Sequence, residues 1–317
     1  MSKYLITGGA GFIGSHFLIY MVNKYPEDLF INLDKLTYAA NLDNLASIST
    51  RSNYRFIKGD ITDRELIFDL FKKESFDIVI NFAAESHVDR SIAYVPDFIN
   101  TNVVGTMNLL DACKKYGIAR FHQVSTDEVY GDTPIDSREL FNENSLIKPS
   151  SPYSASKASA DMLVMAYQRT YNLSVSISRC SNNYGYFQHP EKLIPLVITR
   201  ALHNEPLPIY GNGKNIRDWI HVLDHCKAID FIIHHPTIGE IYNIGSHNEV
   251  SNIDLVKCIL DILDKPYDLI TYVKDRPGHD LRYAIDSSKL QCLGWKPEID
   301  FKEGLRDTIE YYKKSIK

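Results

Sequence analysis

The chain of 317 residues is long enough for one large domain or two ordinary domains with a substantial hydrophobic core. It has 35 Lys and Arg residues against 40 Asp and Glu residues, a formal net charge of −5, and 44% of its residues are hydrophobic. This balance is typical of a soluble globular protein and argues against general nucleic-acid binding, which usually requires a basic surface. It does not exclude an anionic small molecule, because a few well-placed Arg and Lys side chains can bind one.

Cysteine usage and the lack of long apolar runs exclude further classes. The cysteines form no C-x-x-C pair, so neither a zinc site nor a disulfide framework is indicated, and we expect reduced thiols at Cys113, Cys180, Cys226, Cys258 and Cys292. The first residues run straight into a strand-like segment, so we expect no signal peptide. No apolar run approaches the ~18 residues of a membrane span. We therefore expect a cytoplasmic protein.

Short apolar runs alternate with helical patterns through the first half of the chain. Several runs are apolar at successive positions, as in strands that are covered on both faces. The alternation predicts a Rossmann-type, doubly wound parallel sheet of the α/β class. The expected strands are residues 4–7, 29–33, 54–58, 78–82, 121–124 and 175–178. The expected helices are residues 13–24, 64–73, 96–116 and 154–171.

The pattern changes in the second half of the chain. Strand-like runs become sparser, and Arg, His, Pro and Gly collect in expected loops at residues 210–217 and 275–282. Helical patterns persist further along, at residues 222–234 and 253–263. We expect a dinucleotide-binding domain of residues 1–181, to which some later segments return, and a smaller mixed α/β substrate-binding domain of residues 182–317.

A glycine-rich turn joins the first strand to the first helix, with Gly8, Gly11 and Gly14 spaced as G-x-x-G-x-x-G. Such a turn brings backbone N–H groups and a helix N-terminus to a pyrophosphate, although a purely structural turn can also carry glycines. Asp34 follows Gly14 by twenty residues, at the end of the next strand. A carboxylate there accepts hydrogen bonds from the ribose and repels a 2′-phosphate, which favours NAD over NADP despite the adjacent Lys35.

A second carboxylate, Asp60, follows the third expected strand. It could bind the adenine amino group, and it could also cap the helix expected from residue 64. Further along, Tyr153 and Lys157 lie four residues apart on one face of an expected helix. The nearby ammonium should lower the pKa of the Tyr153 phenol, which suits a general base. Ser125 or Thr126 would hydrogen-bond the reacting oxygen.

Two adjacent carboxylates, Asp127 and Glu128, stand at the carboxyl end of a central strand, where doubly wound folds place ligands. They could belong to a solvated turn or a helix cap. A simple reductase needs no such pair, whereas an enzyme that eliminates water needs one group to remove a proton from carbon and another to protonate the departing hydroxyl. Neighbouring carboxyl groups in a dry site separate their pKa values and can fill these two roles.

These motifs together resemble the extended short-chain dehydrogenase/reductases of the NAD-dependent epimerase/dehydratase family, and within them the dTDP-glucose 4,6-dehydratases. The resemblance spans essentially the whole chain, although some loops are shorter here than is common in the family. Its markers are residues 7–14, 34–39, 82–89, 125–131, 153–157, 178–185, 217–219 and 275–283.

The resemblance implies a reaction in which the sugar is oxidised only transiently. Tyr153, supported by Lys157, would take the C4 hydroxyl proton while hydride passes to NAD, and Thr126 would hydrogen-bond the C4 oxygen. The ketone acidifies C5–H, so Glu128 could remove that proton while Asp127 protonates the departing C6 hydroxyl. Hydride returned to C6 would give a 4-keto-6-deoxy sugar, and hence a lyase of deoxysugar biosynthesis.

The resemblance also implies the residues around both ligands. The expected cofactor-binding residues are Gly8, Gly11, Phe12, Ile13, Gly14, Asp34, Lys35, Thr37, Asp60, Ile61, Ala83, Ala84, Ser86, Thr101, Ser125, Tyr153 and Lys157. The expected substrate-binding residues are Ser86, His87, Thr126, Asn182, Glu191, Lys192, Leu193, Arg217, Asn252, Arg276, His279 and Tyr283. Arg217 and Arg276 would bind the pyrophosphate, because a guanidinium group suits phosphate oxygens, although either one alone could belong to a surface ion pair.

Metal and partner expectations are limited. No metal site is expected, and we interpret His221, His225, His234 and His235 as structural because no companion ligands stand at metal spacing. The resemblance implies a homodimer formed through the helices at residues 96–116 and 154–171, although burial against the sheet would explain the same apolar positions. We expect neither nucleic acid nor a membrane as a partner.

Three other functions remain open. A dehydratase for a CDP-, GDP- or UDP-linked sugar would share every catalytic residue, since base choice depends on a few pocket contacts. A sugar-nucleotide 4-epimerase would share the glycine loop and the Tyr153–Lys157 pair, but it usually has small residues in place of Asp127 and Glu128. A non-catalytic NAD-sensing regulator would keep the loop and lose the tyrosine, which is present here.

Overall fold

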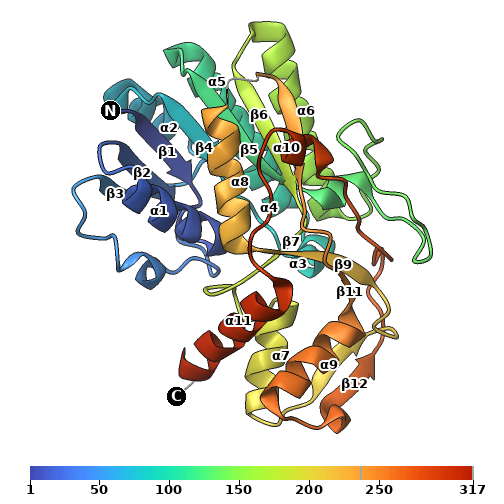
Figure 1. Ribbon diagram of the computed structural model, residues 1–317. Helices are drawn as coiled ribbons and strands as arrows, with labels where there is room; N and C mark the ends of the chain where they lie inside the picture. The colour runs from blue at the N-terminus through green and yellow to red at the C-terminus, as the bar shows by residue number, and fades with distance from the viewer. Residues whose placement is uncertain (236–237, 316–317) are drawn as a thin grey trace.

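The computed structural model describes residues 1–235 and 238–315 and is built around a seven-stranded parallel sheet (Figure 1). Its strands, from one edge to the other, are β10 (Glu240–Ile244), β6 (Val175–Cys180), β5 (Arg120–Thr126), β4 (Ile78–Asn81), β1 (Lys3–Thr7), β2 (Leu29–Asp34) and β3 (Tyr54–Lys58). The Rossmann-type sheet and its first six strands are thereby confirmed. The strand order reverses between β1 and β4, which is where doubly wound sheets bind ligands.

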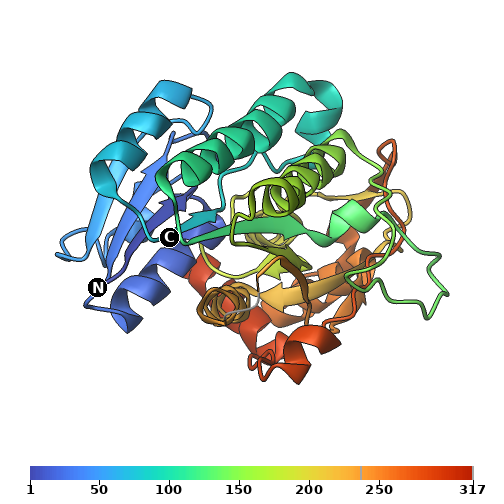
Figure 2. The ribbon, with the colours of Figure 1, turned by 90° about the horizontal axis from the view of Figure 1, so that it is seen from above.

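Helices cover both faces of this sheet (Figure 2). Helices α1 (Phe12–Lys24) and α8 (Val222–His234) pack on one face. On the other face lie α2 (Arg64–Glu74), α5 (Thr106–Tyr116) and α6 (Pro152–Tyr171). Neighbouring strand residues Leu5 and Ile6 are fully buried in opposite cores. Burial on both faces explains why the strands are apolar at successive positions.

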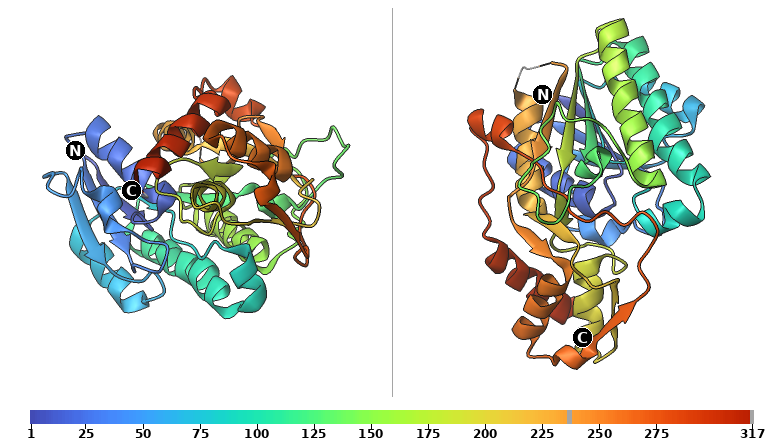
Figure 3. Two further views of the ribbon diagram at one scale, coloured as in Figure 1. Left: turned by 90° about the horizontal axis from the view of Figure 1, so that it is seen from below. Right: turned by 90° about the vertical axis from the view of Figure 1, so that its right-hand side faces the viewer.

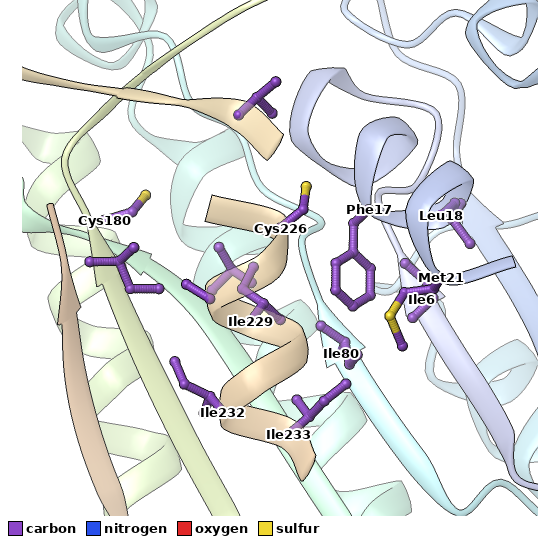
Figure 4. Close-up of a cluster of buried hydrophobic side chains, with 14 of the residues drawn as sticks. Ile6, Phe17, Leu18, Met21, Ile80, Cys180, Cys226, Ile229, Ile232 and Ile233 are labelled. Atoms are coloured by element: carbon purple, nitrogen blue, oxygen red, sulfur yellow. The ribbon is translucent and has the colours of Figure 1, made fainter. Parts of the chain in front are cut away.

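The core between α1 and α8 brings together segments that are far apart in the sequence. Phe17 and Met21 of α1 meet Ile229 and Ile233 of α8 over Ile6 of β1 (Figure 4). Helix α8 and strand β10 thus return from the second half of the chain to the sheet. This return fixes the second half of the chain against the first.

The helix expected at residues 96–116 is not uniform. The structure divides it into α4 (Pro96–Phe98), a π-helical segment η2 (Ile99–Gly105) and α5. Asn102 of η2 donates from Nδ2 to Ser156 Oγ at 2.8 Å and to the Glu85 carbonyl oxygen at 3.0 Å. The π-helical segment therefore ties the loop after β4 to the helix that carries Tyr153. Such segments occur frequently at functional sites.

Most of the remaining chain forms a smaller unit beyond the carboxyl ends of the parallel strands (Figure 3). One small sheet contains β11 (Glu249–Ser251), β9 (Ile216–His221) and β7 (Asn182–Tyr184), and another contains β12 (Ile270–Val273) and β8 (Leu207–Tyr210). Helices α7 (Leu193–Leu202), α9 (Asn252–Leu263) and α11 (Phe301–Ser315) pack around a separate hydrophobic core. The loop expected at residues 210–217 is shorter in the structure, because β8 ends at Tyr210 and β9 begins at Ile216.

Short elements complete the chain. They are η1 (Leu42–Leu45), α3 (Val88–Ala93), the 3-10 turn η3 (Asp127–Tyr130), η4 (Tyr267–Leu269) and α10 (Ser288–Cys292). Within the described ranges, no helix combines the length and the hydropathy needed to cross a membrane. In the same part of the chain, no three His, Cys, Asp or Glu side chains cluster in a way that could hold a metal ion.

A buried carboxylate joins α1 to α8. Asp230 of α8 is 4% exposed and accepts hydrogen bonds from Tyr20, Tyr25 and Lys24, while His234 contacts it at 2.9 Å. These donors favour the ionised form, so they lower the pKa of Asp230 from its ordinary 3.8 to about 2 despite the opposing effect of burial. Asp230 thus stabilises the folded chain when it is ionised.

Replacing Asp230 by Asn is expected to reduce the free energy of unfolding at pH 7 by about 2–3 kcal/mol, since one pKa unit corresponds to ~1.4 kcal/mol. The stabilisation by Asp230 is complete above its unfolded pKa of 3.8 and is lost as the pH falls through about 2. The two proteins should therefore converge in stability at strongly acidic pH. Urea unfolding at neutral and acidic pH measures this, and equal stability at pH 7 would refute the role given to Asp230.

Candidate functional site

The main cavity lies at the carboxyl ends of the parallel strands, where the strand order reverses between β1 and β4. Every residue expected to bind the cofactor lines this cavity. Of the expected substrate-binding residues, those that line it are Ser86, Thr126, Asn182, Glu191 and Lys192. The others lie outside its lining and are His87, Leu193, Arg217, Asn252, Arg276, His279 and Tyr283.

The glycine turn has the shape that a dinucleotide requires. Gly8 has a φ of +70°, and a Cβ there would lie 2.6 Å from the Ala83 backbone nitrogen, so only glycine fits. A Cβ on Gly14 would collide with the Gly8 carbonyl oxygen, which keeps α1 close to β1. Helix α1 has Gly11 at its N-cap position and no side-chain cap. Its first N–H groups are therefore left to hydrogen-bond a phosphate group.

Asp34 lies at the end of β2 and fixes the adjacent loops. Its Oδ2 accepts the Ala10 N–H at 2.9 Å, and its Oδ1 accepts the Leu36 N–H at 2.8 Å. Burial raises the pKa of Asp34, and these two hydrogen bonds oppose that rise. The carboxylate is thus held in place at the edge of the cavity.

Asp60 also lines the cavity, but it does not cap the following helix. Its Oδ1 accepts the Thr62 N–H at 2.9 Å, whereas the cap of α2 is Asp63, which accepts the Leu66 N–H at 3.0 Å. The capping interpretation of Asp60 is therefore wrong, because the helix begins three residues too late for it. Its other oxygen, Oδ2, lies 3.8 Å from Lys35 Nζ at the edge of the cavity.

Tyr153 and Lys157 lie in the first turns of α6, whose start is fixed by a capping box between Ser151 and Ser154. Both side chains are buried, and Lys157 Nζ donates to the Val124 carbonyl oxygen at 2.6 Å. Burial and then Glu128 raise the pKa of Tyr153, and burial lowers the pKa of Lys157. The expectation that Lys157 lowers the pKa of Tyr153 is thus wrong for the protein without bound ligands, because the loss of solvent around Tyr153 outweighs any effect of the lysine.

The acidic pair occupies a short turn at the end of β5. Thr126 caps this turn, and its Oγ1 accepts the Glu128 N–H at 3.3 Å. Asp127 is 3% exposed, and its Oδ2 has no hydrogen-bond partner among the described residues. Burial and then Glu128 raise the pKa of Asp127 well above its ordinary value. Asp127 is therefore suited to hold a proton.

Glu128 has a different electrostatic environment. Burial raises its pKa, but Arg217 and Arg276 oppose that effect. Tyr283 donates from its hydroxyl to Glu128 Oε2 at 3.4 Å and lies under the guanidinium of Arg217, 4.0 Å from ring centroid to Cζ. Asp127 and Glu128 thus have the separated proton affinities that an acid and a base need.

One of the two expected phosphate-binding arginines lies in a strand and the other in a loop. Arg217 of β9 donates from Nη2 to the Asp280 carbonyl oxygen at 2.9 Å, and Arg276 pairs with Asp89 at 2.9 Å. The buried Nε of Arg276 has no partner among the described residues. This free donor fits an anionic ligand better than an isolated surface ion pair.

The remaining expected substrate contacts are tied to this region through the backbone or through carboxylates. His279 contacts Asp275 at 2.6 Å, and Asn252 opens α9 with its backbone N–H bonded to the Asn215 carbonyl oxygen at 2.9 Å. Leu193 is the first residue of α7.

Glu191 joins three loops at the edge of the cavity. It accepts a hydrogen bond from Tyr38 at 3.1 Å, and His87 Nε2 and Arg90 Nη2 each lie 3.6 Å from its Oε2. The Arg90 guanidinium also lies 3.6 Å from the centre of the Tyr38 ring. Tyr38 and Arg90 were not among the expected site residues, although Tyr38 belongs to the marker at residues 34–39, because the loop of Tyr38 and helix α3 meet only in the folded chain.

Cys180 is another cavity residue that the sequence analysis missed. It ends β6, lines the cavity near Lys157, and has a thiol whose pKa burial raises to about 12. Its position at the carboxyl end of a central strand could have indicated this location. The thiol therefore stays neutral and does not balance the positive charge of Lys157.

Known proteins share this arrangement. A family model described as GDP-mannose 4,6 dehydratase matches residues 5–308. A dTDP-glucose 4,6-dehydratase of Salmonella typhimurium is 50% identical over 334 residues, covering 98% of this chain and 92% of that protein. The chain belongs to the dTDP-glucose 4,6-dehydratase family.

Solved structures agree with this membership. The dTDP-glucose 4,6-dehydratase of Streptomyces venezuelae, solved with NAD bound, is 45% identical, has a TM-score of 0.95, and is matched over 98% of this chain and 97% of that chain. A UDP-glucose 4-epimerase of Thermus thermophilus has a TM-score of 0.90 at 28% identity, with 98% and 99% covered. The dehydratase family thus shares its fold with epimerases.

Proposed function

We propose that this chain catalyses the NAD-dependent dehydration of dTDP-glucose to dTDP-4-keto-6-deoxyglucose. The observation that carries the proposal is the pair Asp127 and Glu128 at the end of β5, which lines the same cavity as Tyr153 and the glycine turn. Two carboxyl groups with separated proton affinities have a role in eliminating water and none in a simple transfer of hydride.

The cavity fits NAD on three structural grounds. The start of α1 is uncapped, the turn at Gly8 excludes any side chain, and Asp34 is held where a ribose would lie. When bound, NAD would accept hydride from C4 of the sugar and return it to C6. The side chains of the protein would bind and orient the substrate and transfer the protons. The residues that would hold the cofactor are those that line the cavity at the glycine turn, at Asp34 and at Asp60.

Tyr153 would receive the proton of the C4 hydroxyl, and Thr126 would orient that oxygen. Lys157 would stabilise the phenolate of Tyr153 as it forms, because a buried ammonium attracts a neighbouring negative charge. The resulting ketone makes C5–H acidic enough for a carboxylate to remove its proton.

Glu128 would then act as the base at C5, because Arg217 and Arg276 favour its ionised form. Asp127, whose pKa burial raises well above its ordinary value, would donate a proton to the departing C6 hydroxyl. The same two arginines would bind the pyrophosphate of the nucleotide, which links substrate binding to the charge of Glu128.

Product analysis tests this function. The purified protein is incubated separately with dTDP-, CDP-, GDP- and UDP-glucose, and each product is examined by mass. Loss of water from dTDP-glucose at the highest kcat/KM is expected. If only another nucleotide sugar lost water, that sugar would be assigned as the substrate. Inversion at C4 without loss of water would favour an epimerase.

Asp34→Asn should weaken NAD binding at least ~10-fold, because a neutral amide binds the ribose hydroxyls less strongly and cannot accept both loop N–H groups. Titration calorimetry on the protein stripped of nucleotide measures this. Asp63→Asn is the matched control, since asparagine caps helix α2 as well as aspartate does. An unchanged NAD affinity in Asp34→Asn would exclude the ribose contact.

We further propose a cytoplasmic homodimer. Exposed apolar side chains gather on and before the two helices expected at the interface: Ile92, Tyr94, Val95, Ile99 and Met162 are each at least 39% exposed. A second copy of the chain would cover them. Sedimentation equilibrium that gives the mass of a monomer at micromolar concentration would exclude this assembly.

A further inference from the structure

A buried ion pair lies behind the catalytic residues and takes no part in the reaction described above. Arg179 of β6 is 1% exposed and Asp161 of α6 is fully buried, and Arg179 Nε donates to Asp161 Oδ2 at 2.9 Å. Removing two charges from water is costly, and a hydrophobic pair of similar volume often stabilises a core as well or better. Stability alone is therefore a weak reason for this pair.

One end of the pair faces the catalytic lysine. Asp161 follows Lys157 by four residues on α6, so the two side chains share one face of the helix. The carboxylate of Asp161 opposes the lowering of the Lys157 pKa that burial causes. The other groups that face Lys157 are the Val124 carbonyl oxygen of β5 and the Cys180 thiol of β6. Asp161 is thus the carboxylate that stabilises the ammonium form of Lys157.

The other end reaches the turn that carries the acidic pair. Arg179 Nη1 donates to the Tyr130 hydroxyl at 2.9 Å, and that hydroxyl donates to Asn243 Oδ1 at 2.8 Å. Tyr130 is the last residue of the turn η3, which begins with Asp127. A continuous set of polar contacts therefore joins the helix of Tyr153 and Lys157 to the turn of Asp127 and Glu128.

We propose that Asp161 and Arg179 are positioning residues: Asp161 stabilises the ammonium of Lys157 from the same face of α6, and Arg179 pairs with Asp161 while fixing the acid–base turn through Tyr130. The proposal deepens the proposed dehydratase function and rests on it for its kinetic consequences. Its electrostatic part concerns the protein alone and can be measured without turnover.

The variant Asp161→Asn/Arg179→Gln tests the electrostatic part, because it removes both charges together and leaves neither one buried and unpaired. Lysine is labelled with ¹³C at Cε, and the Lys157 signal is assigned by its loss in Lys157→Gln. The midpoint of the Lys157 titration should fall by at least ~1 pH unit in the double variant, because loss of a neighbouring carboxylate disfavours the ammonium. An unchanged midpoint would overturn the proposal whatever the activity.

The unmutated protein gives a second test that does not depend on the folding of a variant. Lys157 should be cationic at pH 8 in the folded chain, and a neutral signal there would also overturn the proposal. Asp161→Asn alone provides a further variant with the same expected direction. Asp230→Asn is the matched control, since it removes a buried carboxylate from the distant α1–α8 contact and should leave the Lys157 midpoint unchanged.

Kinetics test the link to catalysis. With dTDP-glucose, the alkaline fall in the rate of cofactor reduction should move to lower pH in the double variant, with KM changed less than threefold. A purely structural role predicts a loss of rate that is equal at every pH, which would refute positioning. Tyr130→Phe keeps both charges but breaks the contact with the turn, so it should slow elimination and leave the Lys157 midpoint unchanged. Failure of dTDP-glucose to react at all would count against the dehydratase function, while the lysine titration would still decide the electrostatic proposal.

Discussion

Glu128→Gln is expected to reduce its bound cofactor when dTDP-glucose is added and then to stop before water is lost. The first step requires Tyr153 and Thr126, which the change leaves intact. The second step requires a base at C5, and the amide of glutamine cannot take that proton. Loss of general base catalysis typically costs 10²–10⁴-fold, so product formation should fall ~10³-fold while the reduction step stays within ~10-fold.

Rapid mixing separates the two steps. The near-ultraviolet absorbance of the reduced cofactor reports the first step, and quenched samples analysed by mass report the loss of water. Glu139→Gln is the control, since Glu139 is exposed and should leave both rates unchanged. If Glu128→Gln slowed both steps equally, Glu128 would be positioning the sugar and the assignment of the base would fail.

Tyr153→Phe should leave the cofactor oxidised and abolish product, with a fall of ~10³-fold or more in the first step. The phenol is the group placed to accept the C4 hydroxyl proton, and phenylalanine fills nearly the same buried volume without it. The fold and the affinity for NAD should change little. The two variants therefore stop the reaction on opposite sides of the ketone.

The same mixing experiment measures this variant, with Tyr167→Phe as its control. Tyr167 lies about four turns further along the same helix, does not line the cavity, and donates to Asp111 at 2.7 Å. Reduction of the cofactor by Tyr153→Phe at close to the normal rate would show that another group accepts the proton.

The central fold could be predicted because burial on both faces leaves a strong local pattern. Strands such as β1 are apolar at successive positions (Tyr4, Leu5 and Ile6) and are separated by amphipathic helices. The π-helical turn at Asn102 could not be predicted, since its residues fit a regular helix and only the contacts with Glu85 and Ser156 distinguish it. The short strands β7 and β8 likewise depend on partners that are distant in the sequence.

Many residues that line the cavity could be predicted because they stand in local motifs, such as the turn at Gly8 or the carboxylate at Asp34. The contacts that join separate segments at the edge of the cavity could not be predicted. Tyr38 and Arg90 reach Glu191 from separate segments, and nothing in the sequence shows that these segments meet. The direction in which the pKa of Tyr153 shifts was wrongly predicted for a related reason. Spacing along a helix reveals a neighbouring charge, but it does not reveal the loss of solvent that outweighs the effect of that charge.

The most direct test of the dehydratase account follows one hydrogen atom. The purified protein is supplied with dTDP-glucose that carries deuterium at C4, and the product is examined by NMR and mass. Transient oxidation at C4 with hydride return predicts a 4-keto-6-deoxy product that has deuterium at C6 and a solvent hydrogen at C5. Deuterium retained at C4, or lost to solvent while water is eliminated, would contradict the account.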